Sequence, residues 1–297
     1  MQPRSLIRPG LLFIALAGAA LFVFAACGDD KKDNEPAATS TQAAASNTPV
    51  GGEIDISGVT ELEDGTLSIG SDIAYAPMEF YQEGTETADG LDVDLANAIA
   101  AVLGVDVEFI NTGFDGIIPA LNTEDFDIIM SAMTIDDERS AQVDFVPYLN
   151  VGTGILVPAG NPNNIEDEND LCGLTVAVQL GTVQEKLIDG LNDTCDEPID
   201  KLTFDTNPLA VEELRTGGAD ANLSDYPVAY LDAQESGGDL EVLDTNVEPQ
   251  PYGIAVRKGD TALADVLEQA LQVVISDGTY QDLLDKWDLA TTALPRD

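Results

Sequence analysis

Hydrophobic residues change their spacing repeatedly from residue 67 onward, and this alternation predicts strands followed by helices. Leu67–Ile69 and Val105–Phe109 have the short apolar pattern of strands. Between them, apolar residues recur at helical spacing from Leu91 to Leu103. The chain therefore begins its folded part with a strand–helix–strand unit.

The same alternation continues to the end of the chain. Further strands are expected at Phe126–Met130, Thr175–Val178, Leu202–Phe204, Ala221–Leu223 and Tyr252–Val256. Further helices are expected at Gln184–Leu191, Ala210–Arg215, Tyr226–Gln234, Leu263–Ile275 and Tyr280–Trp287. This order predicts an α/β fold with mostly parallel sheets. Ligands in such folds bind beyond the carboxyl ends of the strands, so functional residues are expected in the loops that follow strands.

The N-terminus has the pattern of an export signal. Arg4 and Arg8 precede an uncharged apolar stretch at 11–26, which is shorter than the ~20 residues that a membrane-spanning helix needs. We therefore expect residues 1–26 to be a secretory signal peptide. Ala25-Ala26-Cys27 resembles the lipobox of bacterial lipoproteins, in which the cysteine becomes lipid-modified, although Phe24 stands where that motif usually has leucine. The alternative is an ordinary signal peptide with an incidental cysteine.

Residues 27–60 are expected to form the lipidated cysteine and a flexible tether, because the segment is rich in Ala, Ser, Thr, Asn and Asp and has no apolar periodicity. The other two cysteines are Cys172 and Cys195. In an exported protein, two cysteines that close a modest loop predict a disulfide, here within the second half of the fold. Two buried free thiols are the alternative.

The charge excludes several classes of function. The 297 residues include 55 acidic and 12 basic residues and no histidine, which gives a formal charge of −43. A chain this acidic repels phosphate backbones, so nucleic-acid binding is not expected. Without histidine, neither a Ser-His-Asp arrangement nor a histidine-ligated metal can form. No metal site and no cofactor is expected.

Four loops that follow predicted strands carry polar or aromatic residues, and these loops are the candidate site. They are Ser71–Phe80, Thr112–Leu121, Ser131–Arg139 and Gln179–Gln184.

Arg139 is the only basic residue between Asp33 and Glu185. An arginine in a wholly acidic stretch needs an anionic partner, and its planar fork fits a carboxylate through two hydrogen bonds. The partner is either a ligand carboxylate or a carboxylate nearby in the sequence. The nearby candidates are Asp136, Asp137 and Asp144.

Other loop residues have two interpretations each. Ser131 and Thr134 supply hydroxyls that suit either a ligand or a helix cap. Tyr75 and Phe114 suit either stacking on a ligand or ordinary packing.

Several polar residues stand where helices are expected to begin. Thr182 and Val183 open a helix, and their backbone N–H groups can bind an anion. Asp225 follows a strand and suits either a ligand or the N-cap of the next helix. Asp92 and Asp94 are expected to begin their helix rather than to bind a ligand.

Taken in order, these segments resemble the extracellular solute-binding proteins, family 3, of amino-acid ABC importers. The resemblance covers residues 67–289, and its most specific segments are Gly90–Ile99, Phe114–Leu121, Met133–Arg139 and Val143–Phe145. It implies a type II periplasmic-binding-protein fold, in which two α/β lobes are joined by two hinge strands and one ligand lies in the cleft.

The resemblance also places the hinges and the lobe boundaries. The hinges are expected near Leu149–Leu156 and Pro251–Val256. Residues 61–150 and 254–297 are expected to form lobe 1, and residues 151–253 lobe 2.

The resemblance further implies how the ligand is held. Arg139 and Thr134 bind the ligand α-carboxylate, together with the backbone amide of Val183. The Ala132 carbonyl, Thr134 and Asp225 bind the α-ammonium. Many relatives have threonine or glycine where Val183 stands, so any hydroxyl contact to the carboxylate is lost there.

At the other end of the ligand, the resemblance implies that Tyr75 and Phe114 sandwich the side chain and that Asp72 lies at its polar end. Asp72 and the acidic surroundings favour a polar or cationic L-amino acid. The chain is thus expected to be a monomeric, lipid-anchored binding protein outside the cytoplasmic membrane, which delivers an amino acid to the membrane subunits of an ABC permease and has no enzyme activity. The alternatives are an amino-acid sensor that presents to a receptor and a dehydratase-like enzyme on the same fold.

Overall fold

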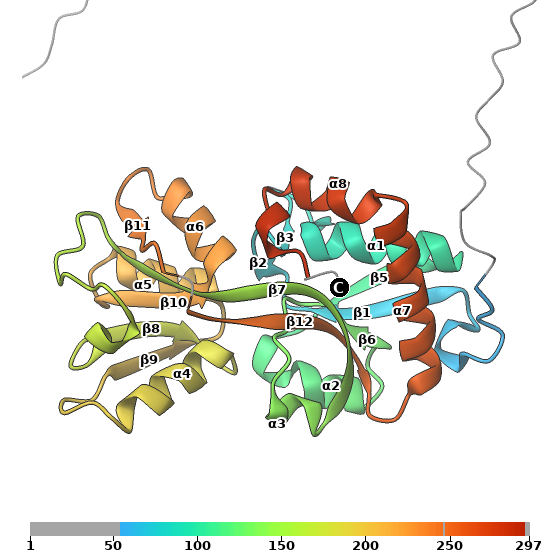
Figure 1. Ribbon diagram of the computed structural model, residues 1–297, viewed down its shortest axis with the longest axis horizontal. Coiled ribbons are helices and arrows are strands. Elements are labelled where there is room, and N and C mark those ends of the chain that lie inside the picture. The colour runs from blue at the N-terminus through green and yellow to red at the C-terminus, as the bar shows by residue number, and fades with distance from the viewer. Residues whose placement is uncertain (1–53, 246, 295–297) are drawn as a thin grey trace, which may run out of the picture. The chain divides into compact units, whose positions relative to one another are not determined.

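A computed structural model of the chain describes residues 54–294 except Asn246 (Figure 1). The expected signal peptide, Cys27 and most of the expected tether lie outside the described residues. No helix in the described ranges is long and apolar enough to cross a membrane.

Lobe 1 is built on the parallel strands β5 (Asp106–Asn111), β1 (Thr66–Ser71) and β6 (Ile128–Ile129). Helices α1 (Leu91–Leu103), α7 (Thr261–Ser276) and α8 (Thr279–Lys286) cover one face, and α2 (Ile117–Asn122) and α3 (Asp137–Ser140) lie on the other. Because side chains alternate along a strand, Ile128 packs with the first set of helices and Ile129 with α2.

Lobe 2 repeats this arrangement with the parallel strands β10 (Ala221–Asp225), β8 (Thr175–Gln179) and β9 (Asp200–Phe204). Val176 and Val178 pack against α4 (Val183–Asn192), whereas Ala177 faces α5 (Asn207–Arg215) and α6 (Tyr226–Glu235). The short strand β11 (Leu240–Val242) completes this lobe.

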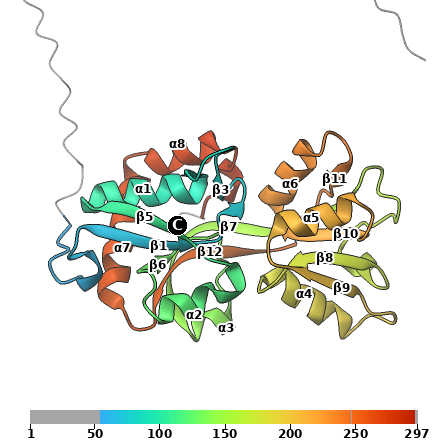
Figure 2. The same ribbon diagram turned by 180° about the vertical axis from the view of Figure 1, so that it is seen from behind.

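Two long antiparallel strands, β7 (Val143–Pro158) and β12 (Val247–Arg257), connect the lobes (Figures 1 and 2). β12 pairs with β6 of lobe 1 and β7 pairs with β10 of lobe 2, so one sheet runs through both lobes in the order β5-β1-β6-β12-β7-β10-β8-β9. These strands contain both expected hinge segments, and the two-lobed α/β fold is confirmed. The sheet is not mostly parallel, because every pairing that joins the two lobes at its centre is antiparallel.

The folded part begins before the expected end of the tether at residue 60. Val59 is 3% exposed and packs in the lobe 1 core, with Leu62 of the 3-10 helix η1 (Thr60–Leu62) beside it. Ile54 and Ile56 pack against the same core. The tether boundary was therefore wrong for these residues, because a few widely spaced apolar side chains anchor a segment that is polar in composition.

The hydrophobic pattern of the sequence did not predict several short strands and helices. They are the three-stranded sheet of β2 (Ala74–Tyr75), β3 (Glu79–Tyr81) and β4 (Ala88–Asp89), and the 3-10 helices η2 (Phe114–Gly116), η3 (Glu168–Leu171) and η4 (Ala290–Thr292). Elements of two to four residues carry too few apolar positions to show a period.

Cys172 and Cys195 form the expected disulfide, with their Cα atoms 5.5 Å apart. Cys172 lies just before β8, and Cys195 lies just after α4. The bond therefore ties the first strand of lobe 2 to the end of the helix that packs on it.

Replacing both cysteines, Cys172→Ser with Cys195→Ser, should lower the free energy of unfolding by about 3 kcal/mol, because the bond closes a loop between residues 23 apart in the unfolded chain. Urea unfolding measures the change. Reductant should shift the midpoint of the wild type and leave that of the double variant unchanged. A double variant as stable as the wild type would contradict this role.

Candidate ligand-binding site

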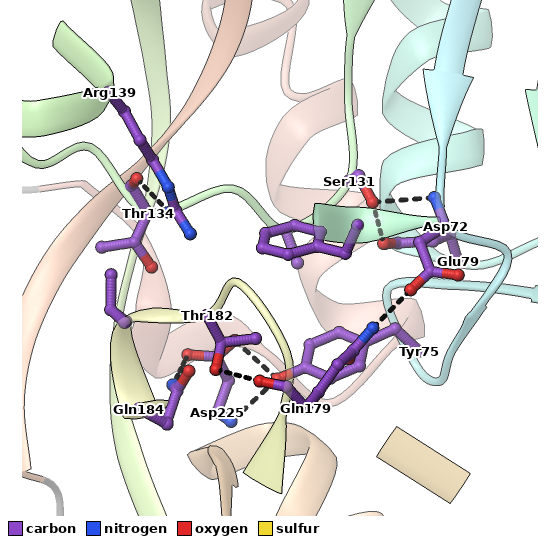
Figure 3. Close-up of a pocket in the computed structure, with 13 residues that line it drawn as sticks. Asp72, Tyr75, Glu79, Ser131, Thr134, Arg139, Gln179, Thr182, Gln184 and Asp225 are labelled. Atoms are coloured by element: carbon purple, nitrogen blue, oxygen red, sulfur yellow. Dashed lines mark hydrogen bonds between the residues drawn. The ribbon is translucent and has the colours of Figure 1, made fainter. Parts of the chain in front are cut away.

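One cavity between the lobes gathers the residues expected at the site (Figure 3). The space between atoms at this site, part of which is open to solvent, is about 290 Å³. It is lined by Asp72, Tyr75, Glu79, Phe114, Ser131, Ala132, Thr134, Arg139, Gln179, Thr182, Val183, Gln184 and Asp225. All ten residues that the sequence analysis named as ligand-binding are in this lining. They come from loops at the carboxyl ends of β1, β6, β8 and β10 and from η2 and α3, where an α/β sheet is expected to bind ligands.

Arg139 projects into the cavity from α3 and is 5% exposed. Its Nη1 donates to the Thr134 carbonyl at 2.6 Å, and its Nη2 donates to the Gly181 carbonyl of lobe 2 at 3.1 Å. The guanidinium also stacks over Phe114, 5.2 Å from the ring centre. Its nearest carboxylate is Asp136, whose Oδ2 lies 3.9 Å from Nε. Both Nη atoms are thus fixed by carbonyls, and the fork has N–H groups left for a carboxylate.

The nearby carboxylates bind other cations. Asp136 Oδ2 lies 2.9 Å from Lys186 Nζ, and its Oδ1 accepts from the Arg139 backbone as the N-cap of α3. Asp144 binds Lys258. The interpretation of Arg139 as half of a strong local ion pair is therefore not favoured by this geometry.

Asp225 stands at the N-cap position of α6, but its side chain makes no capping hydrogen bond. It turns into the cavity instead, where Oδ2 accepts from the Tyr75 hydroxyl at 2.8 Å and Oδ1 accepts from Gln184 Nε2 at 2.9 Å. Burial raises the pKa of Asp225, although these hydrogen bonds and the charge of Arg139 oppose the rise. This buried carboxylate is ready to accept a cation.

The start of α4 faces the same space. Thr182 is its N-cap: the hydroxyl accepts from the Glu185 amide at 3.2 Å and donates to the Gln179 carbonyl at 2.7 Å. Val183 is the first helical residue, so its N–H is one of those that a helix leaves without an internal partner. The Thr182 hydroxyl thus shapes the turn, while the Val183 amide can bind an anion.

Ser131 and Ala132 form a bend that is held by hydrogen bonds to Asp72, Glu79 and Asp92. The Ser131 hydroxyl accepts from the Asp72 amide at 2.9 Å and donates to Glu79 Oε1 at 2.8 Å. Ala132 has φ of 44°, which is uncommon for a residue other than glycine, and its amide donates to Asp92 Oδ2 at 2.8 Å. Neither residue caps a helix, and both line the cavity.

Asp72 is 5% exposed and accepts a hydrogen bond from Gln179 Nε2, which comes from lobe 2. Burial raises the pKa of Asp72 to about 6, and the neighbouring carboxylate of Asp115 contributes to the rise. A ligand cation at this position would favour the ionised form.

Tyr75 and Phe114 both line the cavity, and each also has a second contact. Tyr75 is 7% exposed, and its hydroxyl accepts from the Asp225 amide at 3.0 Å as well as donating to the Asp225 carboxylate. Phe114 lies under the Arg139 guanidinium. Tyr75 thus links lobe 1 to lobe 2 directly.

The two lobes are in contact around the cavity. The contacts are Tyr75 with Asp225, Asp72 with Gln179, Arg139 with the Gly181 carbonyl, and Lys186 with Asp136 and Glu138. The structure therefore describes the closed arrangement of the cleft.

Three lining residues were not singled out from the sequence: Glu79, Gln179 and Gln184. All three lie within the strand-following loops that the sequence analysis did identify. Their position was thus a usable signal, but their residue types were not distinctive. Asp92 and Asp94 do lie in the first turn of α1, as expected. Asp94 binds Lys286 and Trp287 at the surface, whereas Asp92 is fully buried behind the Ala132 bend.

Comparison with known proteins identifies the class that this fold and cavity define. The family model of the bacterial extracellular solute-binding proteins, family 3, matches residues 67–290. The chain belongs to this family, which confirms the resemblance that the sequence motifs carry.

Individual proteins are similar to this chain in sequence or in structure. The chain is 33% identical over 226 residues to the L-cystine-binding protein TcyJ of Escherichia coli (strain K12), a match that covers 76% of this chain and 83% of that protein. It is similar in structure to an ancestral arginine-binding protein bound to arginine, with 38% identity, a TM-score of 0.71 and coverage of 75% and 98%. It is also similar to an ancestral amino acid-binding protein that is a precursor of cyclohexadienyl dehydratase, with 41% identity, a TM-score of 0.70 and coverage of 76% and 96%.

Gly181 sets a limit on closure that can be tested. It has φ of +80°, and a Cβ there would lie 3.0 Å from the Asp115 Cα and 3.2 Å from the Asp115 Cβ of the opposite lobe. Gly181→Ala should therefore oppose closure and weaken ligand binding by about tenfold or more, since 1.4 kcal/mol corresponds to tenfold. Isothermal titration calorimetry measures the loss.

Gly217→Ala is the matched control. Gly217 also has φ of +80°, but nothing lies within 4 Å of its Cβ position, so the substitution adds the same backbone strain without the contact between lobes. Equal affinity losses in the two variants would contradict the closure argument.

Proposed function

We propose that the protein binds a free L-amino acid with a cationic side chain outside the cell and delivers it to an ABC permease. The observation that carries this proposal is the imbalance of charge in the cavity. Its lining contains the carboxyl groups of Asp72, Glu79 and Asp225, and its one cation is Arg139.

The backbone part of an amino acid uses one charge of each sign. Its carboxylate fits the Arg139 fork with the Val183 amide, and its ammonium fits Asp225 with the Ala132 carbonyl and Thr134. Binding a zwitterion therefore leaves Asp72 and Glu79 without a cationic partner. A positively charged side chain supplies that partner, and Asp72 is its direct acceptor.

The aromatic residues suit the same ligand. Tyr75 and Phe114 line the cavity, and rings of this kind stack on methylenes and on guanidinium groups. A glutamate or aspartate ligand would instead bring a second carboxylate, and the lining offers it no second cation. The ancestral protein bound to arginine supports the proposal by analogy, since it shares 38% identity with this chain.

Closure links binding to transport. The carboxylate of the ligand is assigned to residues of lobe 1 with the Val183 amide of lobe 2, and the ammonium to Asp225 of lobe 2 with residues of lobe 1. Only the closed cleft pairs both ends at once, so the ligand stabilises the closed form by its differential affinity. The closed form is then what a permease can distinguish from the empty protein.

We propose binding without chemical turnover. The similarity to a dehydratase precursor makes a dehydratase the second candidate, and it has a direct assay, the turnover of prephenate-like substrates. Consumption of such a substrate would favour the enzyme over the binding protein.

Arg139→Ala should weaken amino-acid binding by tens- to thousands-fold, because removing one partner of a buried charge pair costs roughly 2–5 kcal/mol. Arg139→Lys should also bind poorly, because an ammonium cannot reproduce the two parallel hydrogen bonds of the fork. Asp225→Asn should cost less than Arg139→Ala, since the amide keeps one acceptor for the ammonium. Calorimetry on folded variants measures each affinity.

Arg215→Ala is the control for these variants. Arg215 is half-exposed on α5, and it binds Glu212 one turn away. Its removal should leave the affinity unchanged. If Arg139→Ala also keeps the wild-type affinity, the assignment of the ligand carboxylate is wrong.

A panel of amino acids in a thermal-shift assay should show the largest stabilisation with L-arginine or L-lysine. A ligand at ~100 times its Kd adds about 2.7 kcal/mol to the stability of the native state. L-Glutamate and L-aspartate should give no shift at the same concentration. Tightest binding to either acidic amino acid would overturn the charge argument.

The N-terminal sequence indicates where the protein is located. Family members are extracellular solute-binding proteins, and we propose that this one is held at the membrane by a lipid on Cys27 after residues 1–26 are removed. Mass spectrometry of the native N-terminus should find diacylglyceryl-modified Cys27. An unmodified N-terminus at another residue would contradict the anchor.

A further inference from the structure

A pair of buried carboxyl groups lies beside the cavity, and neither of them is assigned a direct contact with the ligand. Glu79 is 1% exposed and lines the cavity, and Asp92 is fully buried behind it. Glu79 comes from β3 and Asp92 from the first turn of α1. Both are held by the same bend, since the Ser131 hydroxyl donates to Glu79 Oε1 and the amide of the next residue, Ala132, donates to Asp92 Oδ2, while Glu79 Oε2 is buried without a partner among the described residues.

The surrounding contacts indicate which group is the anion. Asp92 Oδ2 accepts from the Ala132 amide at 2.8 Å, and its two oxygens accept from the Tyr148 hydroxyl at 2.9 and 2.8 Å. The first turn of a helix also favours negative charge. Among the described residues, Glu79 accepts a side-chain hydrogen bond from the Ser131 hydroxyl alone, at 2.8 Å. Asp92 is therefore the better-compensated carboxylate of the two, and Glu79, with one buried oxygen unpartnered, is the group that favours the protonated form.

Burial raises the pKa of Glu79 well above its ordinary value. The acidic neighbours Asp92, Asp72 and Asp225 add to this rise, and the hydrogen bond from Ser131 opposes it. The Tyr75 and Tyr148 hydroxyls beside the pair have raised pKa values and stay neutral. Burial also raises the pKa of Asp92 to about 7.

The cation of the cavity is remote from this pair. Figure 3 shows Arg139 on one side of the cavity and Glu79 with Asp72 on the other. An amino acid with its carboxylate on Arg139 therefore places its side chain toward Glu79.

We propose that Glu79 and Asp92 share a proton and that the pair releases it to solvent when a cationic side chain enters the cavity. The O–H bond of Glu79 breaks, the proton passes to water or buffer, and the side-chain cation takes over the compensation of the new carboxylate. The inference rests on the proposed function, and it makes this pair a determinant of the preference for positive charge.

Proton release fixes the direction of the pH dependence. Protons and the cationic ligand compete for the Glu79–Asp92 pair. The affinity for the cationic ligand should therefore fall as the pH falls, over the range in which the pair is protonated in the free protein. The limit is about tenfold per pH unit for one proton released. A neutral side chain gains nothing from the loss of the proton, so its affinity should depend little on pH in the same range.

Calorimetric titration of the purified protein with L-arginine, in phosphate and in Tris at pH 7.5, tests the proposal. The two buffers take up a proton with different heats, so release shows as a difference between the two binding enthalpies. Asp72, whose pKa is about 6, is already largely ionised at this pH. We expect a clear difference with L-arginine and a smaller one with L-citrulline, its uncharged analogue. Equal enthalpies in both buffers for L-arginine would overturn the inference, whereas failure of L-arginine to bind would overturn the proposed function beneath it.

Two variants locate the proton. Glu79→Gln keeps the shape but cannot titrate, so it should lose most of the buffer difference and narrow the preference for L-arginine over L-citrulline. Asp232→Asn is the control: Asp232 is an acid of lobe 2 whose pKa burial raises to about 6, and it binds Asn207 outside the cavity lining. It should keep the wild-type release. Undiminished proton release in Glu79→Gln would overturn the inference. If that variant does not fold, the pH dependence of the wild-type protein decides instead: an affinity for L-arginine that does not change between pH 6.5 and 8 would overturn the inference.

Discussion

A buried arginine without a full carboxylate partner is the constraint on which the site depends. Arg139 is 5% exposed, and its fork is fixed by carbonyls from both lobes rather than by a side-chain anion. A buried charge is tolerated only when it is paired or extensively hydrogen-bonded. In the proposed binding mode, the ligand carboxylate completes this pairing, and the ligand ammonium completes that of Asp225. Because the two charges belong to different lobes, the ligand and the closed cleft stabilise each other.

The connection between the lobes explains how such a site can open. β7 and β12 cross from lobe 1 to lobe 2 as one antiparallel ribbon, and the sheet continues on both sides of it. The lobe 1 core cluster includes Val228 of α6 from lobe 2, and hydrogen bonds and an ion pair join the lobes around the cavity. Polar contacts exchange readily with water, so the hydrogen bonds between the lobes add little net stability to the closed form. Ligand binding can therefore decide the equilibrium.

The sequence predicted the fold and the site loops well, and for physical reasons. Strands and helices of lobe 1 and lobe 2 have strong periodicity, and the loops after strands converge at one edge of the sheet. Local sequence left two interpretations open where a tertiary contact decides: Asp225 stands at an N-cap position, but its side chain bonds to Tyr75 and lines the cavity. Glu79 was missed because a glutamate in so acidic a chain carries no signal of burial. Val59 was assigned to the tether because its partners in the core are distant in the sequence.

The central claim is that Arg139 recognises the carboxylate of the ligand and no other part of it. Agmatine has the ammonium and guanidinium of L-arginine but lacks the carboxylate, so comparing the two ligands on wild type and Arg139→Ala forms a cycle that isolates this contact. The account predicts that the substitution weakens L-arginine binding strongly and agmatine binding little. Equal weakening of both ligands would show that Arg139 supports the cavity without binding the carboxylate, and it would contradict the account.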